Sequence, residues 1–410
     1  MKSFACASLL VLLGVAASGA QAPSLDETLA SVRRPIALRD GRLDGPGGEL
    51  LRAALRATPY VLVGEDHGLA EIPAFSAAVF RELAARGVRD LVLEVGPEAG
   101  RRLTRAVNAA DPDAEIQRWV RQYPFSLAFY DLVQEFQFLR QARAAAGPGL
   151  RITGVDQELM GASRMLLESV AARDDALPGL LALEQQAYAR AVASGNPLDL
   201  FMLTGPADAL GALRDRLARA TPARDAGLVT SLLESRRIYE LNAQSGYQSN
   251  LTRAALMKRY YVEQTPPDLR AAPPPTLFKF GAYHVMKGLN LLESREIGNY
   301  VAEVADGRGT PSLHILVMAV KGRQRRFDGV GKPYTAAPVD QVGPGVSDFP
   351  FAKPVFERAL AEEGWSLFDF REMRRWALRQ AGLDPRLLRM VSGFDLAVLI
   401  PEGTPSDQIQ

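Results

Sequence analysis

Residues 60–68 read Tyr-Val-Leu-Val-Gly-Glu-Asp-His-Gly, a short apolar run that passes into a polar turn. The run lacks the alternation of a half-exposed strand, so it predicts a strand buried on both faces, as in a parallel sheet. The segment Ala70 to Arg86 follows with apolar positions at helical spacing, and a second apolar run comes at Asp90 to Leu93. The opening unit is therefore expected to be strand, helix, strand.

Similar apolar runs recur along the chain and extend the predicted sheet. They are Leu150 to Val155, Thr276 to Phe280, Leu313 to Val320 and Asp395 to Ile400. Helical spacing also fits Gly100 to Ala109 and Phe125 to Ala145, whereas the basic run Lys321 to Arg326 is interpreted as a solvated loop. We therefore expect an α/β fold with a mostly parallel central sheet flanked by helices.

The middle of the chain has a different pattern. Between about residues 161 and 263 no strand pattern occurs, and leucine and alanine recur at helical intervals. This region is expected to be an inserted helical subdomain, and the proline-rich stretch Pro266 to Pro275 to return the chain to the sheet. Residues 23–410 are then expected to form a single α/β domain that carries the insertion.

Residues 1–22 have the layout of a cleavable export signal. Lys2 precedes an apolar run from Ala7 to Val15, and small residues lead up to Ala22. The run is shorter than the roughly 20 residues that span a bilayer. We therefore expect an exported protein, periplasmic or secreted, with no integral membrane segment after cleavage. The single cysteine, Cys6, lies in this leader, so the exported chain has no thiol for a disulfide, a metal or a nucleophile.

Charge and motifs exclude several classes of function. The chain has 48 lysines and arginines against 47 acidic residues, and Lys2 lies in the leader, so the exported part has no net charge to attract nucleic acid. Nucleic acid is therefore not expected as a partner. The sequence contains no Gly-x-Ser-x-Gly elbow, no His-Glu-x-x-His pair and no phosphate-binding loop.

Titratable side chains stand at the ends of the predicted strands. In chain order they are Glu65 and His67, then Glu94, then Asp156, and finally His284. Ligands of open parallel sheets bind beyond the carboxyl ends of the strands, so these groups are expected to converge. A neutral imidazole beside a carboxylate can activate water, and two histidines with carboxylates can also hold a divalent metal. His314, inside an apolar run, is instead expected to be a core histidine.

Residues 61–68, with Glu71 three residues on, resemble the opening motif of erythromycin esterase-like proteins. The wider superfamily includes the ChaN haem-binding lipoproteins and the TIKI-type metalloproteases. Further matches follow in family order: Leu93-Glu94, Gly154-Val155-Asp156, Asn250 to Arg253 with Met257, Gly281 to Val285, and Gly393 to Leu399. The resemblance spans roughly residues 60–402.

This resemblance implies a hydrolase that cleaves an ester or lactone of a small molecule and needs no cofactor. His67 would be the general base for water, with Glu94 essential beside it. Glu65 would orient this pair, and His284 would act as a second acid/base or hold the developing oxyanion. The resemblance further implies substrate-binding roles for Glu71, Asp156, Arg253 and Tyr283.

Two alternatives remain open at this point. The first is a divalent-metal-dependent hydrolase or protease of the TIKI type, with His67, His284 and either Glu94 or Asp156 as ligands. The second is a haem- or iron-binding protein of the ChaN type, in which Tyr283 or a histidine would be the axial ligand.

Overall fold

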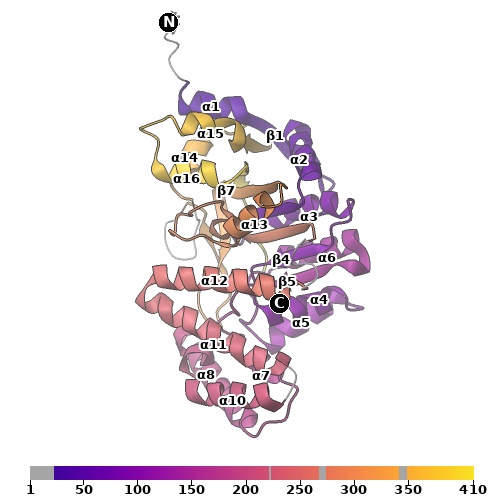
Figure 1. The fold of residues 1–410 in the computed structure, drawn as a ribbon, viewed down its shortest axis with the longest axis vertical. Helices are drawn as coiled ribbons and strands as arrows, with labels where there is room; N and C mark the ends of the chain where they lie inside the picture. The colour runs from indigo at the N-terminus through magenta and orange to yellow at the C-terminus, as the bar shows by residue number, and fades with distance from the viewer. Residues whose placement is uncertain (1–22, 221–222, 267–273, 341–348) are drawn as a thin grey trace, which may run out of the picture.

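The computed structural model describes residues 23–220, 223–266, 274–340 and 349–410. The expected leader and most of the stretch Pro266 to Pro275 lie outside the described residues. Within them, ten strands form one sheet in the order β2-β1-β9-β10-β7-β3-β6-β4-β5, with β8 paired to β7 (Figure 1). The strands are β1 (Arg33–Arg39), β2 (Arg42–Asp44), β3 (Tyr60–Glu65), β4 (Asp90–Leu93), β5 (Arg151–Gly154), β6 (Thr276–Gly281), β7 (Ser312–Arg326), β8 (Thr335–Pro338), β9 (Trp365–Asp369) and β10 (Leu396–Gly403).

The six predicted strands form the parallel centre of the sheet. Strands β10, β7, β3, β6, β4 and β5 are successive parallel neighbours. Strands β9, β1 and β2 continue the sheet beyond β10 with antiparallel pairing. The expected α/β fold with a mostly parallel sheet is therefore confirmed, and the antiparallel edge is an addition to it.

Strand β3 lies in the middle of the sheet and is buried along its whole length. Val61 and Val63 pack on one face with Phe75 of helix α3, whereas Leu62 packs on the other face with Val301 of helix α13. Because both faces are covered by helices, both sets of alternate side chains must be apolar. This burial explains the unbroken apolar run that predicted the strand.

Helices cover the two faces of the sheet and build the insertion. The first group is α1 (Leu25–Val32), α2 (Gly45–Ala57), α3 (Glu71–Ala84), α4 (Pro97–Val107), α5 (Pro112–Gln122) and α6 (Val133–Ala146). The insertion comprises α7 (Ser163–Glu168), α8 (Leu177–Ser194), α9 (Phe201–Thr204), α10 (Ala207–Ala220), α11 (Ala223–Gln244) and α12 (Gly246–Gln264), followed after β6 by α13 (Ile297–Asp306), α14 (Lys353–Glu357), α15 (Phe370–Ala377) and α16 (Pro385–Gly393). Figure 1 shows α7, α8, α10 and α11 gathered at one end of the molecule, with α12 between them and the sheet.

The helix predicted over Phe125 to Ala145 is wrong in its first third. Helix α6 begins only at Val133, and residues 123–132 form a loop in which Phe125 and Phe129 have φ values of 58° and 61°. Bulky residues seldom adopt this left-handed region, which is incompatible with a right-handed helix. Several apolar side chains of this loop line a cavity. Their spacing along the sequence happens to match that of an amphipathic helix.

The chain segment 404–409 holds this loop in place. Gln408 forms an isolated antiparallel bridge with Leu132, and Pro405 forms one with Leu69, next to the turn after β3. The Ile409 amide also donates to the Asp131 carbonyl at 2.9 Å. Segment 404–409 therefore ties the loop 123–132 to the turn that carries His67.

The prediction of a solvated loop for Lys321 to Arg326 is also wrong. These residues continue strand β7, and residues 323–326 pair with β8. The strand extends past the helix-covered sheet, so its side chains change from apolar to polar while its backbone stays extended. Gln324 is only 3% exposed, because this part of β7 forms the wall of a cavity.

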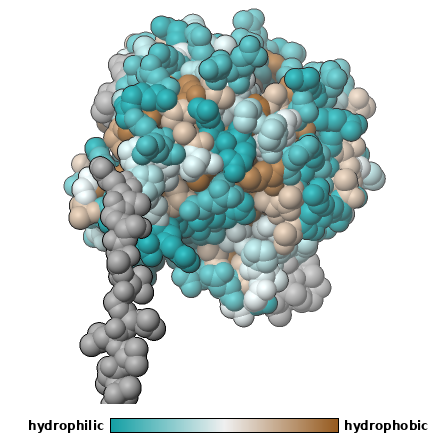
Figure 2. All heavy atoms as spheres, turned by 90° about the horizontal axis from the view of Figure 1, so that it is seen from above, coloured by the Kyte–Doolittle hydropathy of each residue, from teal (hydrophilic) through white to brown (hydrophobic). Residues whose placement is uncertain are grey.

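The outside of the molecule is largely polar in the view of Figure 2, where hydrophobic side chains form only small, separate patches. Across the described ranges, none of the helices combines the length and apolar character that a membrane span requires.

Candidate active site

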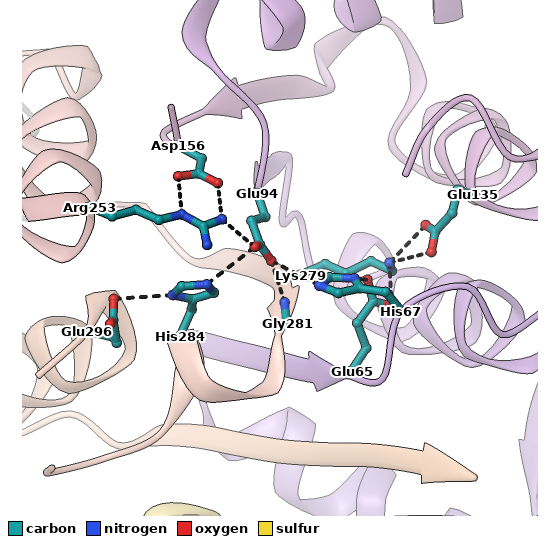
Figure 3. Close-up of polar contacts among 10 residues, drawn as sticks. All are labelled: Glu65, His67, Glu94, Glu135, Asp156, Arg253, Lys279, Gly281, His284 and Glu296. Atoms are coloured by element: carbon teal, nitrogen blue, oxygen red, sulfur yellow. Dashed lines mark hydrogen bonds and ion pairs between the residues drawn. The ribbon is translucent and has the colours of Figure 1, made fainter. Parts of the chain in front are cut away.

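The predicted site residues converge beyond the ends of three adjacent strands. His67 follows β3, Glu94 follows β4, and His284 lies in the short 3-10 turn Ala282–Val285 after β6, which separates the other two strands. Figure 3 shows the two imidazole rings on either side of the Glu94 carboxylate. Glu65, His67, Glu94 and His284 therefore lie close together, as expected from their places at the strand ends.

Glu65 fixes the orientation of the His67 ring. Its Oε1 lies 3.1 Å from His67 Nδ1, and its Oε2 accepts a hydrogen bond of 2.6 Å from the buried ammonium of Lys279. Burial alone would raise the pKa of Glu65, but the charge of Lys279 and the hydrogen bonds from His67 and Lys279 together lower that pKa below its ordinary value. The ionised carboxylate accepts from Nδ1–H, and this tautomer leaves Nε2 facing Glu94.

Glu94 is the hub of the site. Its Oε2 accepts from the Gly281 amide at 2.5 Å and lies 3.6 Å from His67 Nε2. Its Oε1 accepts from Arg253 Nη2 at 2.7 Å and lies 3.3 Å from His284 Nε2. Burial would raise the pKa of Glu94, but the charge and hydrogen bond of His284, together with the charge of Arg253, hold it well below its usual range. Glu94 is therefore a permanent anion shared by three nitrogen-bearing groups.

Gly281 allows this close approach. A Cβ atom at position 281 would lie 2.7 Å from His67 Nε2 and 3.3 Å from Glu94 Oε2. The strand β6 must therefore end in glycine for its amide to reach the carboxylate while the His67 ring passes over it.

His284 is a cation in this setting. Its Nδ1 lies 3.2 Å from Glu296 Oε2, and the other Glu296 oxygen accepts a 2.5 Å hydrogen bond from Ser294. Burial lowers the pKa of His284, but Glu94 and Glu296 raise it more, to about 10. Both ring nitrogens of His284 are then donors at neutral pH, so it stabilises negative charge and does not accept a proton.

Arg253 and Asp156 form the next layer. Arg253 on α12 donates from Nε to Asp156 Oδ1 at 2.9 Å and from Nη2 to both Asp156 and Glu94. Arg253 lines the main cavity, whereas Asp156 lines a smaller adjoining pocket of about 220 Å³. Asp156 therefore holds Arg253 in place, and the predicted substrate contact of Asp156 is not made in the main cavity.

The last two predicted substrate-binding residues are placed differently. Tyr283 lines the cavity, with its ring edge to face against Phe349 at a centroid distance of 5.2 Å. Glu71 does not line it: its carboxylate accepts from the Thr404 amide at 3.1 Å and from the Thr404 hydroxyl at 2.6 Å. The carboxylate of Glu71 therefore anchors the segment 404–409, and its predicted role in substrate binding is not supported by this position.

Sequence reasoning missed four residues that complete the site. Lys279 bridges Glu65 to Glu135, with distances of 2.9 and 2.8 Å to the two Glu135 oxygens, and Glu296 holds His284. Phe129 stacks on the His67 ring at a centroid distance of 3.8 Å and an interplanar angle of 7°. A lysine between two phenylalanines in the run Thr276 to Phe280 was a usable signal, because such a charge needs a buried partner.

A cavity of about 930 Å³ opens in front of these groups. Its lining comes from the turns after β3, β4 and β6, from loop 123–132, from α12 and from the far part of β7. His67, Glu94, Arg253 and His284 all reach this lining. Among the described residues this is the cavity that the strand ends, the insertion and segment 321–334 build together.

The alternative metal set does not fit the arrangement well. No group of three or more His, Cys, Asp and Glu side chains is arranged to hold a metal ion in the ranges that the structure describes. The carboxylates of that set are already bonded to a side-chain cation, because Glu94 and Asp156 both pair with Arg253. The positive charge beside these carboxylates therefore comes from a side chain of the protein itself.

No protein-family model matches the chain, and no curated protein matches it in sequence. Solved structures do. A mutant of the erythromycin esterase EreC in its open conformation matches with a TM-score of 0.63 and 16% identity over 92% of this chain and 99% of that one.

Two further structures match over nearly the whole chain. A protein from Bacillus cereus has a TM-score of 0.57 and 15% identity, covering 94% of this chain and 98% of that one. A succinoglycan biosynthesis protein has a TM-score of 0.55 and 14% identity, with the same coverage of 94% and 98%. At these identities the likeness concerns the fold, and the fold of this chain is erythromycin esterase-like, as the motifs predicted.

Proposed function

We propose that this protein is a hydrolase that cleaves an ester, lactones included, by attack of water activated at His67. The observation that carries the proposal is the chain Glu65–His67–Glu94–His284, which places a carboxylate-oriented imidazole and an imidazolium on the lining of one cavity. An erythromycin esterase among the structures of the same fold supports it.

The first step uses His67 as the base. With Nδ1–H held by Glu65, Nε2 takes a proton from water as the water oxygen forms a bond to the ester carbonyl carbon. The carbonyl double bond opens, and its electron pair becomes the oxyanion of a tetrahedral intermediate. The imidazolium at His67 is stabilised by the two carboxylates beside it, Glu65 and Glu94.

The second step returns that proton. The oxyanion collapses, the bond between the carbonyl carbon and the alcohol oxygen breaks, and the leaving alkoxide takes the proton from His67. The products are a carboxylic acid and an alcohol. His284 and Arg253 supply positive charge that is already oriented, so they stabilise the oxyanion without reorganising.

Substitution of His67 by Asn tests the proposal. The ring is lost while the neighbouring carboxylates keep Lys279 and Arg253, and we expect hydrolysis of aryl esters and lactones to fall by about a thousandfold or more. Asp113→Asn is the control, because Asp113 is an exposed carboxylate outside the cavity lining. Unchanged hydrolysis by correctly folded His67→Asn protein would overturn the proposal.

Further parts of the proposal rest on the sequence. A small-molecule ester is the proposed partner, without a cofactor, and the proposed compartment is the periplasm or the exterior. Dialysis against a chelator tests metal dependence: full activity in metal-free buffer is expected, and loss restored by a divalent ion would support the metal-dependent alternative.

Haem binding of the ChaN type remains the second alternative. Tyr283, its named ligand, lines the cavity. A titration with haemin followed in the visible range decides it, since no Soret shift is expected from an esterase.

A further inference from the structure

A second polar surface lies in the same cavity, apart from the His67 cluster. Asp131 at the end of loop 123–132, Gln324 on the far part of β7 and Tyr334 just before β8 all line the cavity. These three residues are called the acceptor wall below. The proposed reaction uses none of them.

The acceptor wall holds buried oxygen atoms that lack a partner. Seven buried side-chain polar atoms have no hydrogen bond within the described residues, and two of them are Asp131 Oδ1 and Gln324 Oε1. A third, Ser406 Oγ, belongs to the neighbouring segment 404–409. Asp131 is 6% exposed and Gln324 3% exposed. An unpaired buried acceptor costs about 1–3 kcal/mol, so a ligand that brings hydrogen-bond donors to these atoms would be stabilised there.

The surroundings hold these acceptors in a fixed place. Tyr334 donates to Asp131 Oδ2 at 2.5 Å. This bond orients the carboxylate, while Oδ1 has no donor among the described residues. The Gly68 carbonyl, next to His67, accepts from the Ser406 and Arg325 amides, both at 2.9 Å. The acceptor wall is therefore rigidly linked to the turn that carries His67.

Asp131 is an acceptor at neutral pH. Burial raises the pKa of its carboxyl to about 6, although the hydrogen bond from Tyr334 opposes this. The group is ionised above that pH, and its free oxygen then accepts from hydroxyl or ammonium donors.

Aromatic rings stand beside the acceptors. Phe125 and Phe327 stack at a centroid distance of 4.4 Å, and Phe327 meets Tyr334 edge to face at 5.8 Å. All three line the cavity. Aromatic faces carry negative potential, which attracts the polarised C–H groups of a sugar ring while acceptors bind its hydroxyls.

The charge of the cavity selects between the two kinds of donor. The cations Arg253, His284, Arg325 and Arg326 line it beside the carboxylates Asp66, Glu94 and Asp131, so positive charge is in slight excess. Like charge makes such a cavity unfavourable for an ammonium ligand, whereas a neutral hydroxyl meets no repulsion.

We propose that Asp131 and Gln324 form a hydroxyl-binding subsite, so that the substrate is an ester of a sugar or another polyol. The ester part of this statement rests on the proposed function above. The hydroxyl recognition does not, and it is tested separately.

The first experiment compares a butanoylated methyl glucoside with cyclohexylmethyl butanoate, which share the acyl group and a six-membered ring. The wild-type protein should have a lower KM for the glucoside. Asp131→Ala should raise that KM about tenfold, with kcat little changed and with the cyclohexylmethyl ester unaffected. Gln324→Leu, on a different element and of similar volume, should act in the same direction, and the exposed Asp113→Ala is the control.

The second experiment needs no hydrolysis. Octyl glucoside is an acetal without an ester bond, so an esterase leaves it intact. Calorimetry should detect its binding to wild-type protein and binding about tenfold weaker to Asp131→Ala and Gln324→Leu. This result without ester cleavage would retain the subsite and refute the proposed function. Binding that both variants leave unchanged, or wild-type protein that does not bind the glucoside, would overturn the subsite.

Discussion

The cavity has two polar regions that treat their carboxylates in opposite ways. In the first region the buried carboxylates of Glu65 and Glu94 are each bonded to a cation, Glu65 to Lys279 and Glu94 to Arg253. On the acceptor wall Asp131 is buried to a similar degree, but the side chain that donates to its carboxylate within the described ranges is the uncharged hydroxyl of Tyr334.

This difference separates two tasks. Fixed anions with their own cations keep their charge when a reaction moves a proton nearby, which suits transition-state stabilisation. An oxygen left without a donor is costly until a ligand arrives, which suits recognition. Neutralising a carboxylate of the first region should therefore reduce activity, whereas neutralising Asp131 should stabilise the folded protein.

The largest effect is expected from Glu94→Gln. It removes the anion that His67, His284 and Arg253 share, and kcat/KM should fall about a thousandfold, or about 4 kcal/mol. The pKa of His284 should also fall from about 10, because Glu94 is the main charge that raises it.

Proton NMR measures this shift, because the chain has three histidines and burial lowers the pKa of the core residue His314 to about 3. A histidine titration near pH 10 in the wild-type protein then belongs to His284. An unchanged His284 titration in Glu94→Gln would contradict the hub arrangement.

Lys279→Met should be the next largest, and it acts on stability. It leaves Glu65 and Glu135 buried without their cation, so the free energy of unfolding should fall by about 3 kcal/mol. Urea denaturation measures it. Lys321→Met, whose ion pair with Glu357 is exposed, is the matched control and should leave the urea midpoint where it was. Equal losses in the two variants would refute the distinction.

Asp131→Asn should raise the free energy of unfolding, whereas Lys279→Met should lower it. The folded pKa of about 6 lies above the ordinary 3.8, so the native state binds this proton more tightly than the unfolded chain. The resulting stability is present below about pH 4 and is lost as the pH rises to about 6. The amide does not titrate, so it should stabilise the protein by on the order of 2 kcal/mol near pH 8 and by little near pH 4. A difference that does not vary with pH would show that the carboxyl is not perturbed.

Phe129→Leu should have the smallest effect. Losing the stacked ring frees the His67 imidazole to turn, so kcat should fall about tenfold with little change in KM. Phe129→Tyr keeps the stacked face and should restore kcat. If Phe129→Leu raised KM alone, Phe129 would be a substrate contact and not a positioning residue.

The sequence predicted the parts of the site that strand ends deliver. Buried parallel strands have unbroken apolar runs, so a titratable residue at their ends stands out, and Glu65, His67, Glu94 and His284 were all found in this way. The order of the strands could not be predicted in this way, because β6 lies between β3 and β4, which follow one another along the chain.

The remaining groups depend on contacts between distant segments. Lys279 meets Glu135 and Glu65 from 144 and 214 positions away, and no local spacing encodes such a meeting. Phe129 has a left-handed backbone conformation that contacts with other segments stabilise. Its neighbours in sequence contain no sign of this conformation, and their spacing predicted a helix.

The segment 404–409 has a consequence for how the protein folds. Its anchors span 333 positions from Thr404 to Glu71 and 273 from Asp407 to Gln134. Contacts of such long range form slowly, because much chain entropy is lost before they yield any stabilisation. In refolding, helix content should therefore return first and the cavity wall last, so that enzyme activity reappears only after the circular dichroism signal has recovered.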